Sequence, residues 1–178
     1  MDRGRSCASA SPRFCSTECA MEIRREELQG KRIVALDFGL RRIGWAVCDE
    51  LHLSVTPGGV LQYRQADFWE RLQAILTAER AELILVGMPA GSDSPRTAPV
   101  IAALRQFVAQ LRQRFPLPVF VYDETGSTRQ AHETMRQLGI PRKKREQRGQ
   151  ADRMAAAVIL WSFLQELHTW GRVSEEPL

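Results

Sequence analysis

The chain has 178 residues, of which 44% are hydrophobic and 26% charged, and its 25 Lys and Arg residues against 21 Asp and Glu residues give a net charge of +4. These values are typical of one mildly basic globular domain and exclude a disordered, collagen-like or fibrous chain. No apolar run approaches the roughly 20 residues that a membrane-spanning helix needs, so we expect no membrane span and no membrane partner.

The beginning of the chain is rich in Ser and Arg, holds three of the four cysteines and shows no hydrophobic periodicity. We expect residues 1–30 to be a disordered or mis-assigned N-terminal extension, since Met21 offers a second start. One folded domain is expected at 31–170, followed by a flexible C-terminal tail at 171–178. The fourth cysteine, Cys48, is interpreted as a core residue in a reducing cytoplasm.

Apolar patterns then predict two adjacent strands followed by alternating helices and strands. In chain order, strands are predicted at 33–38, 43–48, 55–63, 83–86 and 118–122, and helices at about 68–76, 100–111, 128–138 and 150–167. Pro57 and the pair Gly58-Gly59 make the third strand an irregular or edge strand. Ser94-Pro95 resembles the N-terminal cap of the second helix. The order predicts a three-layer α/β fold in which a mixed five-stranded sheet is flanked by helices.

Carboxylates stand at predicted strand ends and at the start of the last helix, positions that gather at one edge of an open α/β sheet. Asp37 has apolar neighbours and needs a partner or a metal there, although capping of the following turn is a simpler reading. Asp123 and Glu124 follow a strand directly, and side-chain alternation directs only one of them over the sheet edge. Asp152 precedes Ala155–Ala157, which would let its helix approach the sheet closely.

Three carboxylates brought together would repel one another unless a cation binds between them. Mg²⁺ or Mn²⁺ prefers carboxylate oxygens and supports hydrolysis of phosphodiester bonds, so we expect one of these ions as the cofactor. A histidine base is not favoured, because His52 and His168 lack a carboxylate or histidine partner at ligand spacing.

A basic segment at 141–150 carries five basic residues against one acidic residue and leads directly into Asp152. Such a concentration of charge is typical of phosphate binding, although a solvated surface loop is the alternative. Arg41 and Arg42 either add a second phosphate contact beside Asp37 or flank a hairpin turn. The candidate nucleic-acid-binding residues are Arg41, Arg42, Arg142, Lys143, Lys144, Arg145 and Arg148.

Four motifs resemble those of the YqgF/RuvX family in matching order and spacing, and the resemblance covers about 31–167. They are LDFGLRRIGWAVCD at 36–49, VGMP at 86–89, YDETGST at 122–128 and ADRMAA at 151–156. The resemblance implies an RNase H-like fold related to Holliday-junction resolvases. It also implies a cytoplasmic hydrolase, a nuclease in 5′-end processing of pre-16S rRNA during ribosome biogenesis. The acidic triad of the family matches Asp37, Glu124 and Asp152, which the resemblance makes both catalytic and metal-binding.

The chain departs from the family pattern at two places. Thr125 and Gly126 stand where the family usually has Arg and an apolar residue, and Ser92 or Asp93 stands where it commonly has Asn. Both differences concern substrate positioning and leave the three carboxylates in place.

Two other functions stay open beside the RNA nuclease. One is a Holliday-junction-type DNA resolvase, which would work as a dimer to cut two strands symmetrically. The other is a non-catalytic RNA-binding ribosome assembly factor that has lost substrate alignment. The Asp37-Phe-Gly39 turn also suggests an actin-like or sugar-kinase ATPase, but the length argues against it, because one folded unit of about 140 residues cannot supply the two domains such enzymes need. The expected partner is nucleic acid, pre-16S rRNA or branched DNA, and the expected state is a monomer or weak homodimer.

Overall fold

The five strands predicted from apolar runs form one mixed sheet in the computed structural model, which describes residues 22–88, 97–123 and 150–175. In chain order they are β2 (Ile33–Phe38), β3 (Arg42–Cys48), β4 (Val55–Gln62), β5 (Leu83–Met88) and β6 (Val119–Asp123). The strand order is β4-β3-β2-β5-β6. The β2–β5 and β5–β6 pairs are parallel, and the β2–β3 and β3–β4 pairs are antiparallel. The mixed five-stranded sheet predicted from the sequence is confirmed.

Strand β4 is an edge strand with an irregular register, as its Pro and Gly residues predict. Its pairing with β3 shifts between Gly44 and Ala46, which leaves Trp45 at the irregularity. The Trp45 ring lies against both glycines: a Cβ at Gly58 would lie 2.3 Å from two ring carbons, and a Cβ at Gly59 would lie 3.2 Å from the ring nitrogen. The two glycines of the edge strand β4 therefore leave room for a large ring from β3.

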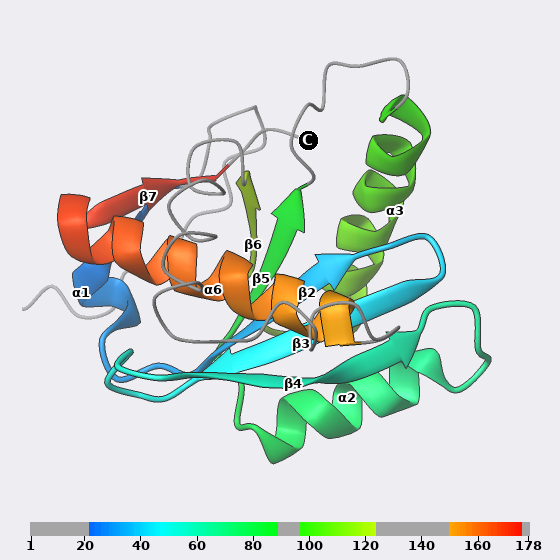
Figure 1. Cartoon of the computed structure of the whole chain (residues 1–178), viewed down its shortest axis with the longest axis horizontal. Helices are drawn as coiled ribbons and strands as arrows, with labels where there is room; N and C mark the ends of the chain where they lie inside the picture. Colours follow the sequence, from blue (N-terminus) through cyan, green and yellow to red (C-terminus); the bar gives the residue numbers. More distant parts are fainter. Residues whose placement is uncertain (1–21, 89–96, 124–149, 176–178) are drawn as a thin grey trace, which may run out of the picture.

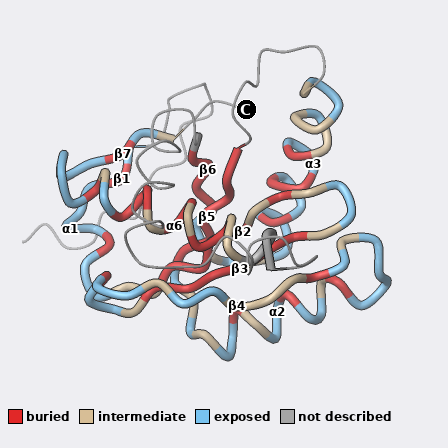
Figure 2. Tube along the Cα trace, viewed as in Figure 1, coloured by how far each residue is buried: buried red, intermediate tan, exposed pale blue. Residues whose placement is uncertain are grey.

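Helices cover both faces of the sheet and complete the three layers (Figure 1). On one face lie α2 (Phe68–Ala78) and α3 (Ala98–Arg114), which bury apolar residues at helical spacing against the sheet. On the other face lies α6 (Gln150–Trp170), with a buried stripe that runs from Ala156 to Leu167. Figure 2 shows the buried residues in the central strands and on the inward sides of the helices. In the part of the chain that the structure describes, no helix has the length and apolar character needed to cross a membrane.

Helix α3 begins later than its expected cap. The N-cap is Thr97 and a proline lies in the first turn, where it needs no hydrogen-bonded N–H. The predicted cap at Ser94-Pro95 is therefore wrong. The predicted helix at 128–138 lies outside the described residues.

Short elements lie outside the expected domain limits at residues 30 and 171. Strand β1 (Glu22–Arg24) pairs antiparallel with β7 (Arg172–Ser174), and α1 (Arg25–Leu28) follows β1. Ile23 and Val173 point from the two strands into the cluster beneath α6. Strands of three residues give no periodic signal in the sequence, and it is this long-range pairing that forms them.

Candidate active site

The candidate site is centred on Asp37, near the carboxyl end of the central strand β2. Side chains alternate along this strand, so Ile33 and Ala35 join the cluster under α6, whereas Val34 and Leu36 join the cluster under α2 and α3. The same alternation assigns Asp37 to the α6 face, where it is half-buried. The carboxylate therefore lies at the end of an apolar surface that a helix covers.

Glycines flank Asp37 on both neighbouring strands. Its register partners are Gly44 on β3 and Gly87 on β5, and Gly87 is in turn paired with Tyr122 on β6. Register partners share one face of the sheet, and strands lie about 4.8 Å apart. The strands on either side of β2 thus contribute no side chain to the α6 face at the level of Asp37.

Small residues bring α6 close to the sheet just before this level. Ala35 and Ala46, which are register partners, belong to the same buried cluster as Ala156 and Ala157 of α6. The chain leaves α6 through β7, which pairs with β1 at the amino-terminal side of β2, so the start of α6 lies toward the carboxyl end of β2 (Figure 1). Position 152 is one helical turn before Ala156 on the same stripe.

The turn between β2 and β3 positions the two arginines beyond Asp37. A Cβ at Gly39 would lie 2.6 Å from the Arg42 carbonyl oxygen, so the turn needs glycine there. The Tyr63 N–H donates a hydrogen bond to the Arg41 carbonyl oxygen at 2.9 Å. Arg41 is exposed and Arg42 is half-buried at the start of β3. The predicted hairpin is confirmed, and its arginines lie at the same end of β2 as Asp37.

Only part of the predicted site falls within the described residues. Glu124 and the basic residues Arg142, Lys143, Lys144, Arg145 and Arg148 lie outside them, and for Asp152 only the backbone is described. Among the described side chains, no three His, Cys, Asp or Glu residues gather closely enough to hold a metal ion. The structure therefore locates Asp37 but does not test the triad.

Asp123 and His52 have positions that bear on the sequence-based alternatives. Val119 and Val121 belong to the cluster under α2 and α3, and Asp123 ends β6 with only its backbone among the described atoms. His52 is buried with a left-handed φ of 57°, and its Nε2 lies 2.8 Å from the Lys31 carbonyl oxygen. It fixes the turn after β3, which agrees with the expectation that it is not a base.

One contact near this end of the sheet, between Tyr122 and Glu166, is not predictable from the sequence. The Tyr122 hydroxyl donates a hydrogen bond to Glu166 Oε2 of α6 at 2.9 Å. Tyr122 begins the third motif, but its partner lies 44 residues further along the chain. The motif therefore marks the tyrosine, whereas only the fold identifies the carboxylate that it contacts.

Sheet order, helical layers and a carboxylate at the end of the central strand define a protein with the RNase H-like fold. A solved structure, T. thermophilus RuvC in complex with a Holliday junction substrate, matches with a TM-score of 0.55 and 16% identity. The match covers 81% of this chain and 99% of that one, and at this identity it shows the fold alone.

Sequence comparison identifies the family. The RuvX family model, described as a Holliday junction resolvase, matches residues 31–166, and the chain belongs to this family. A relative from Chlorobium luteolum is 36% identical over 136 residues, which cover 76% of this chain and 94% of the relative. A relative from Geobacillus kaustophilus is 38% identical over 138 residues, which cover 75% of this chain and 96% of the relative. Both carry the name "Putative pre-16S rRNA nuclease". Family membership makes the chain an enzyme of the nuclease class, a hydrolase of phosphodiester bonds.

Proposed function

We propose that this protein is a metal-dependent nuclease that processes the 5′ end of pre-16S rRNA in the cytoplasm. The observation that carries the proposal is the placement of Asp37: a half-buried carboxylate at the carboxyl end of the central strand, facing α6 and flanked by Gly44 and Gly87. Ligand sites of open α/β sheets lie at this edge. The names of the relatives supply the RNA substrate, because they are named for pre-16S rRNA.

The donor set of the proposed site fits a hard divalent cation. At the level of Asp37, both register partners are glycine, so β3 and β5 supply no donor atom from a side chain at that level and the carboxylate is the donor there. Asp37, Glu124 and Asp152 would together hold Mg²⁺ or Mn²⁺ through carboxylate oxygens. When bound, the ion would lower the pKa of an attacking water and stabilise the leaving oxygen.

Two considerations support Glu124 and Asp152 as the partners of Asp37. Position 124 follows Tyr122 by two residues, and Tyr122 lies on the α6 face, so continued alternation favours Glu124 over Asp123. Position 152 is on the sheet-facing stripe of α6, one turn before buried Ala156. Strand β6, which ends one residue before position 124, and α6, which contains position 152, thus both adjoin the Asp37 end of the sheet.

The basic residues would bind the substrate backbone. Arg41 and Arg42 follow Asp37 in the tight β2–β3 turn, and Arg142, Lys143, Lys144, Arg145 and Arg148 precede Asp152. Lys and Arg side chains that contact phosphates fix the position of the strand without reading its sequence. Their contribution is to align a phosphodiester with the carboxylates, which a monomer or weak homodimer can do.

Cleavage of two labelled substrates tests the proposal: a pre-16S 5′-leader RNA and a four-way DNA junction, each with Mg²⁺, Mn²⁺ or EDTA. The wild-type protein should cut the RNA with metal and not with EDTA. Asp37→Asn should lower kcat by more than about 100-fold, because an amide is a weaker ligand than a carboxylate. The matched control is Asp67→Asn, since Asp67 is exposed at the start of α2 and caps no backbone N–H through its side chain.

The two substrates also separate the alternatives. Metal-dependent cutting of the junction alone would favour the resolvase activity in the description of the family. Binding of RNA without cutting, with every metal tested, would favour a non-catalytic assembly factor. Thr125 and Gly126 would then be the candidates for the loss of substrate alignment. Near-normal turnover by Asp37→Asn would contradict the role of Asp37 as a metal ligand.

A further inference from the structure

Strand β6 ends one residue before Glu124, and the position of its last residues must be fixed by contacts. β6 is an edge strand that pairs with β5 alone in the described sheet, and it ends at Asp123. An edge strand is held by backbone hydrogen bonds on one side only. The direction in which the chain leaves β6 therefore depends on side-chain contacts near its last residues.

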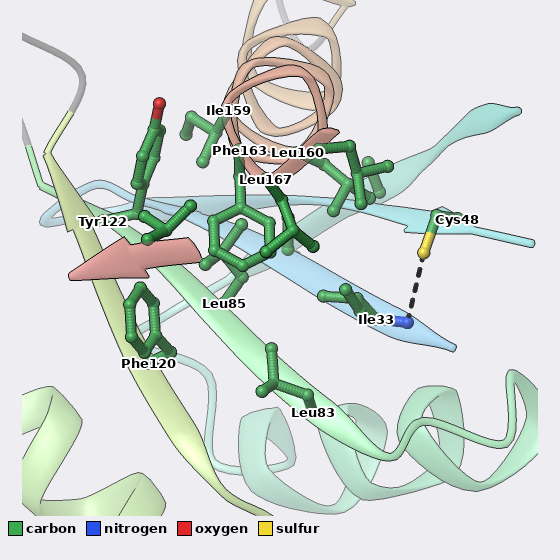
Figure 3. Packing of buried hydrophobic residues seen from close by; sticks show 14 of the residues in the cluster. Ile33, Cys48, Leu83, Leu85, Phe120, Tyr122, Ile159, Leu160, Phe163 and Leu167 are labelled. Atoms are coloured by element: carbon green, nitrogen blue, oxygen red, sulfur yellow. Dashed lines mark hydrogen bonds between the residues drawn. The ribbon is translucent and has the colours of Figure 1, made fainter. Parts of the chain in front are cut away.

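Tyr122 makes such contacts with α6. Its ring is buried, with 4% of its surface exposed, and it meets the Phe163 ring edge-on with centroids 5.6 Å apart. Its hydroxyl donates to Glu166 Oε2 at 2.9 Å. Figure 3 shows Tyr122 extending from β6 beside the helix that carries Phe163. The contact connects the strand that leads to Glu124 with the helix whose first turn contains Asp152.

The hydroxyl and the ring of Tyr122 contribute differently. A phenylalanine would supply the same ring packing on Phe163, so the hydroxyl is not required to fill the core. Its hydrogen bond to an ionised carboxylate is directional and stronger than one between neutral groups. Because it acts one residue before the end of β6, it restricts rotation of the strand at its last residues.

We propose that Glu166 is a positioning residue for the nuclease reaction, acting through Tyr122 to hold the end of β6 so that Glu124 reaches the metal beside Asp37. The proposal rests on the proposed function. Glu166 itself lies about 21 Å along α6 from position 152, at 1.5 Å per residue, and it acts from a distance rather than on the metal. A displacement of about 1 Å in a ligand is enough to cost on the order of 100-fold in rate.

The test compares Tyr122→Phe, Glu166→Ala and Glu166→Gln with wild-type protein in kcat, KM and Mn²⁺ binding by calorimetry. Tyr122→Phe and Glu166→Ala should each lower kcat about tenfold or more and weaken Mn²⁺ binding by a similar factor, with KM for the nucleic acid unchanged. Glu166→Gln keeps an acceptor oxygen and should restore most of the activity. Because the two residues form one contact, the double variant Tyr122→Phe with Glu166→Ala should lose no more than either single variant.

Two variants serve as matched controls. Tyr63→Phe removes the hydroxyl of the other tyrosine, which lies on the opposite face of the sheet beside Phe38 and Phe107. Gln165→Ala changes the exposed neighbour of Glu166 on the same helix. Both should retain the kcat and the Mn²⁺ affinity of the wild-type protein. Tyr122→Phe keeps the buried ring, so it decides the result if Glu166→Ala does not fold.

The outcomes separate the two proposals. If the wild-type protein cleaves and Tyr122→Phe and Glu166→Ala cleave equally well, the positioning role is overturned and the nuclease function stands. If the wild-type protein cleaves nothing, the nuclease function fails and Mn²⁺ titration decides alone. Weaker binding by both variants would then support the part of the proposal that concerns positioning of the metal ligands, whereas equal binding, or no binding by any form, would overturn it.

Discussion

At the scale of single residues, burial controls the chemistry of Cys48. Its side chain is 1% exposed, and its Sγ accepts a hydrogen bond from the Ile33 N–H at 3.3 Å. Burial raises the pKa of the Cys48 thiol to about 11, and the Ile33 N–H only partly offsets this effect. The thiolate is the nucleophile in alkylation, so at pH 8 roughly one thiol in a thousand is reactive.

We therefore expect Cys48 to resist iodoacetamide in the folded protein. In a variant with Cys7, Cys15 and Cys19 replaced by Ser, mass spectrometry at pH 8 should show alkylation at least about 100-fold slower than in the same protein unfolded in urea. The unfolded sample is the control for reagent and pH. Equal rates in the two samples would mean that the thiol is accessible and ionised, contrary to its position in the core.

A second prediction at this scale concerns the packing of Gly58. A Cβ at this position would lie 2.3 Å from two carbons of the Trp45 ring, closer than atoms can approach. Gly58→Ala should therefore lower the free energy of unfolding by about 1–3 kcal/mol, the usual cost of overpacking, as measured by urea denaturation. Gly59→Ala is the control, since its Cβ would lie 3.2 Å from the ring nitrogen and needs a smaller shift. Equal losses in both variants would contradict the steric explanation.

At the scale of secondary-structure elements, the sequence predicts the strands and helices that have a periodic apolar pattern. It does not predict strands that form by pairing with a distant segment. The strands containing Asp37 and Cys48 appear as apolar runs, and α2 as a buried stripe from Phe68 to Leu76. Strands β1 and β7 are three residues long and form because Ile23 and Val173 are buried under α6. No local pattern encodes that pairing, which is why the sequence predicts neither strand.

The segment after β7 also secures the edge of the sheet. Glu175 Oε1 accepts a hydrogen bond from the Val121 N–H of β6 at 3.3 Å and pairs with Arg112 of α3. Arg112 Nη2 also donates to the Val119 carbonyl oxygen at 3.3 Å. The Val119 carbonyl and the Val121 N–H point away from β5. Arg112 and Glu175 therefore form hydrogen bonds with backbone groups that an edge strand would otherwise leave exposed.

The pH dependence of stability tests this pair. Burial raises the pKa of the Glu175 carboxyl above its ordinary value of 4.5, although Arg112 and the Val121 N–H act in the opposite direction. With a raised native pKa, the contribution of the titration to stability is fully present below pH 4.5 and is lost as pH rises through the native value. Glu175→Gln removes this titration, so the wild-type free energy of unfolding should fall relative to the variant as pH rises above 4.5.

Urea denaturation between pH 4 and pH 7 measures the difference. Glu70→Gln on the exposed face of α2 is the control for replacing a carboxyl by an amide. A constant difference for Glu175→Gln would mean that Glu175 titrates alike in the folded and unfolded chain.

At the scale of the whole molecule, the candidate site is only partly readable from the sequence. Asp37 stands out because a carboxylate interrupts an apolar strand, and its place on the central strand agrees with that reading. Its glycine neighbours on β3 and β5 become neighbours only through the register of the sheet. Likewise, Glu166 is one of many surface-type residues on α6 until the fold places it against Tyr122. Motifs thus identify chemistry, whereas contacts between distant segments emerge only in three dimensions.

The last prediction rests on the distribution of charge and concerns the binding of RNA rather than its cleavage. Replacing Arg142, Lys143 and Lys144 with Gln lowers the net charge from +4 to +1. If these residues contact phosphates, RNA affinity should fall and the slope of log K against log salt should become shallower by about 2, at roughly 0.7 per contact on a single strand. Fluorescence anisotropy between 50 and 300 mM salt measures both quantities.

A second triple variant separates local contact from overall charge. Replacing Arg71, Arg80 and Arg105 with Gln removes the same charge from exposed positions on α2, after α2 and on α3, across the sheet from α6. Screening weakens exposed charges beyond about 8–10 Å, so this variant should keep nearly the wild-type slope. Equal slopes in both triple variants would show that the basic segment before α6 attracts RNA only through net charge, and would remove it from the binding surface.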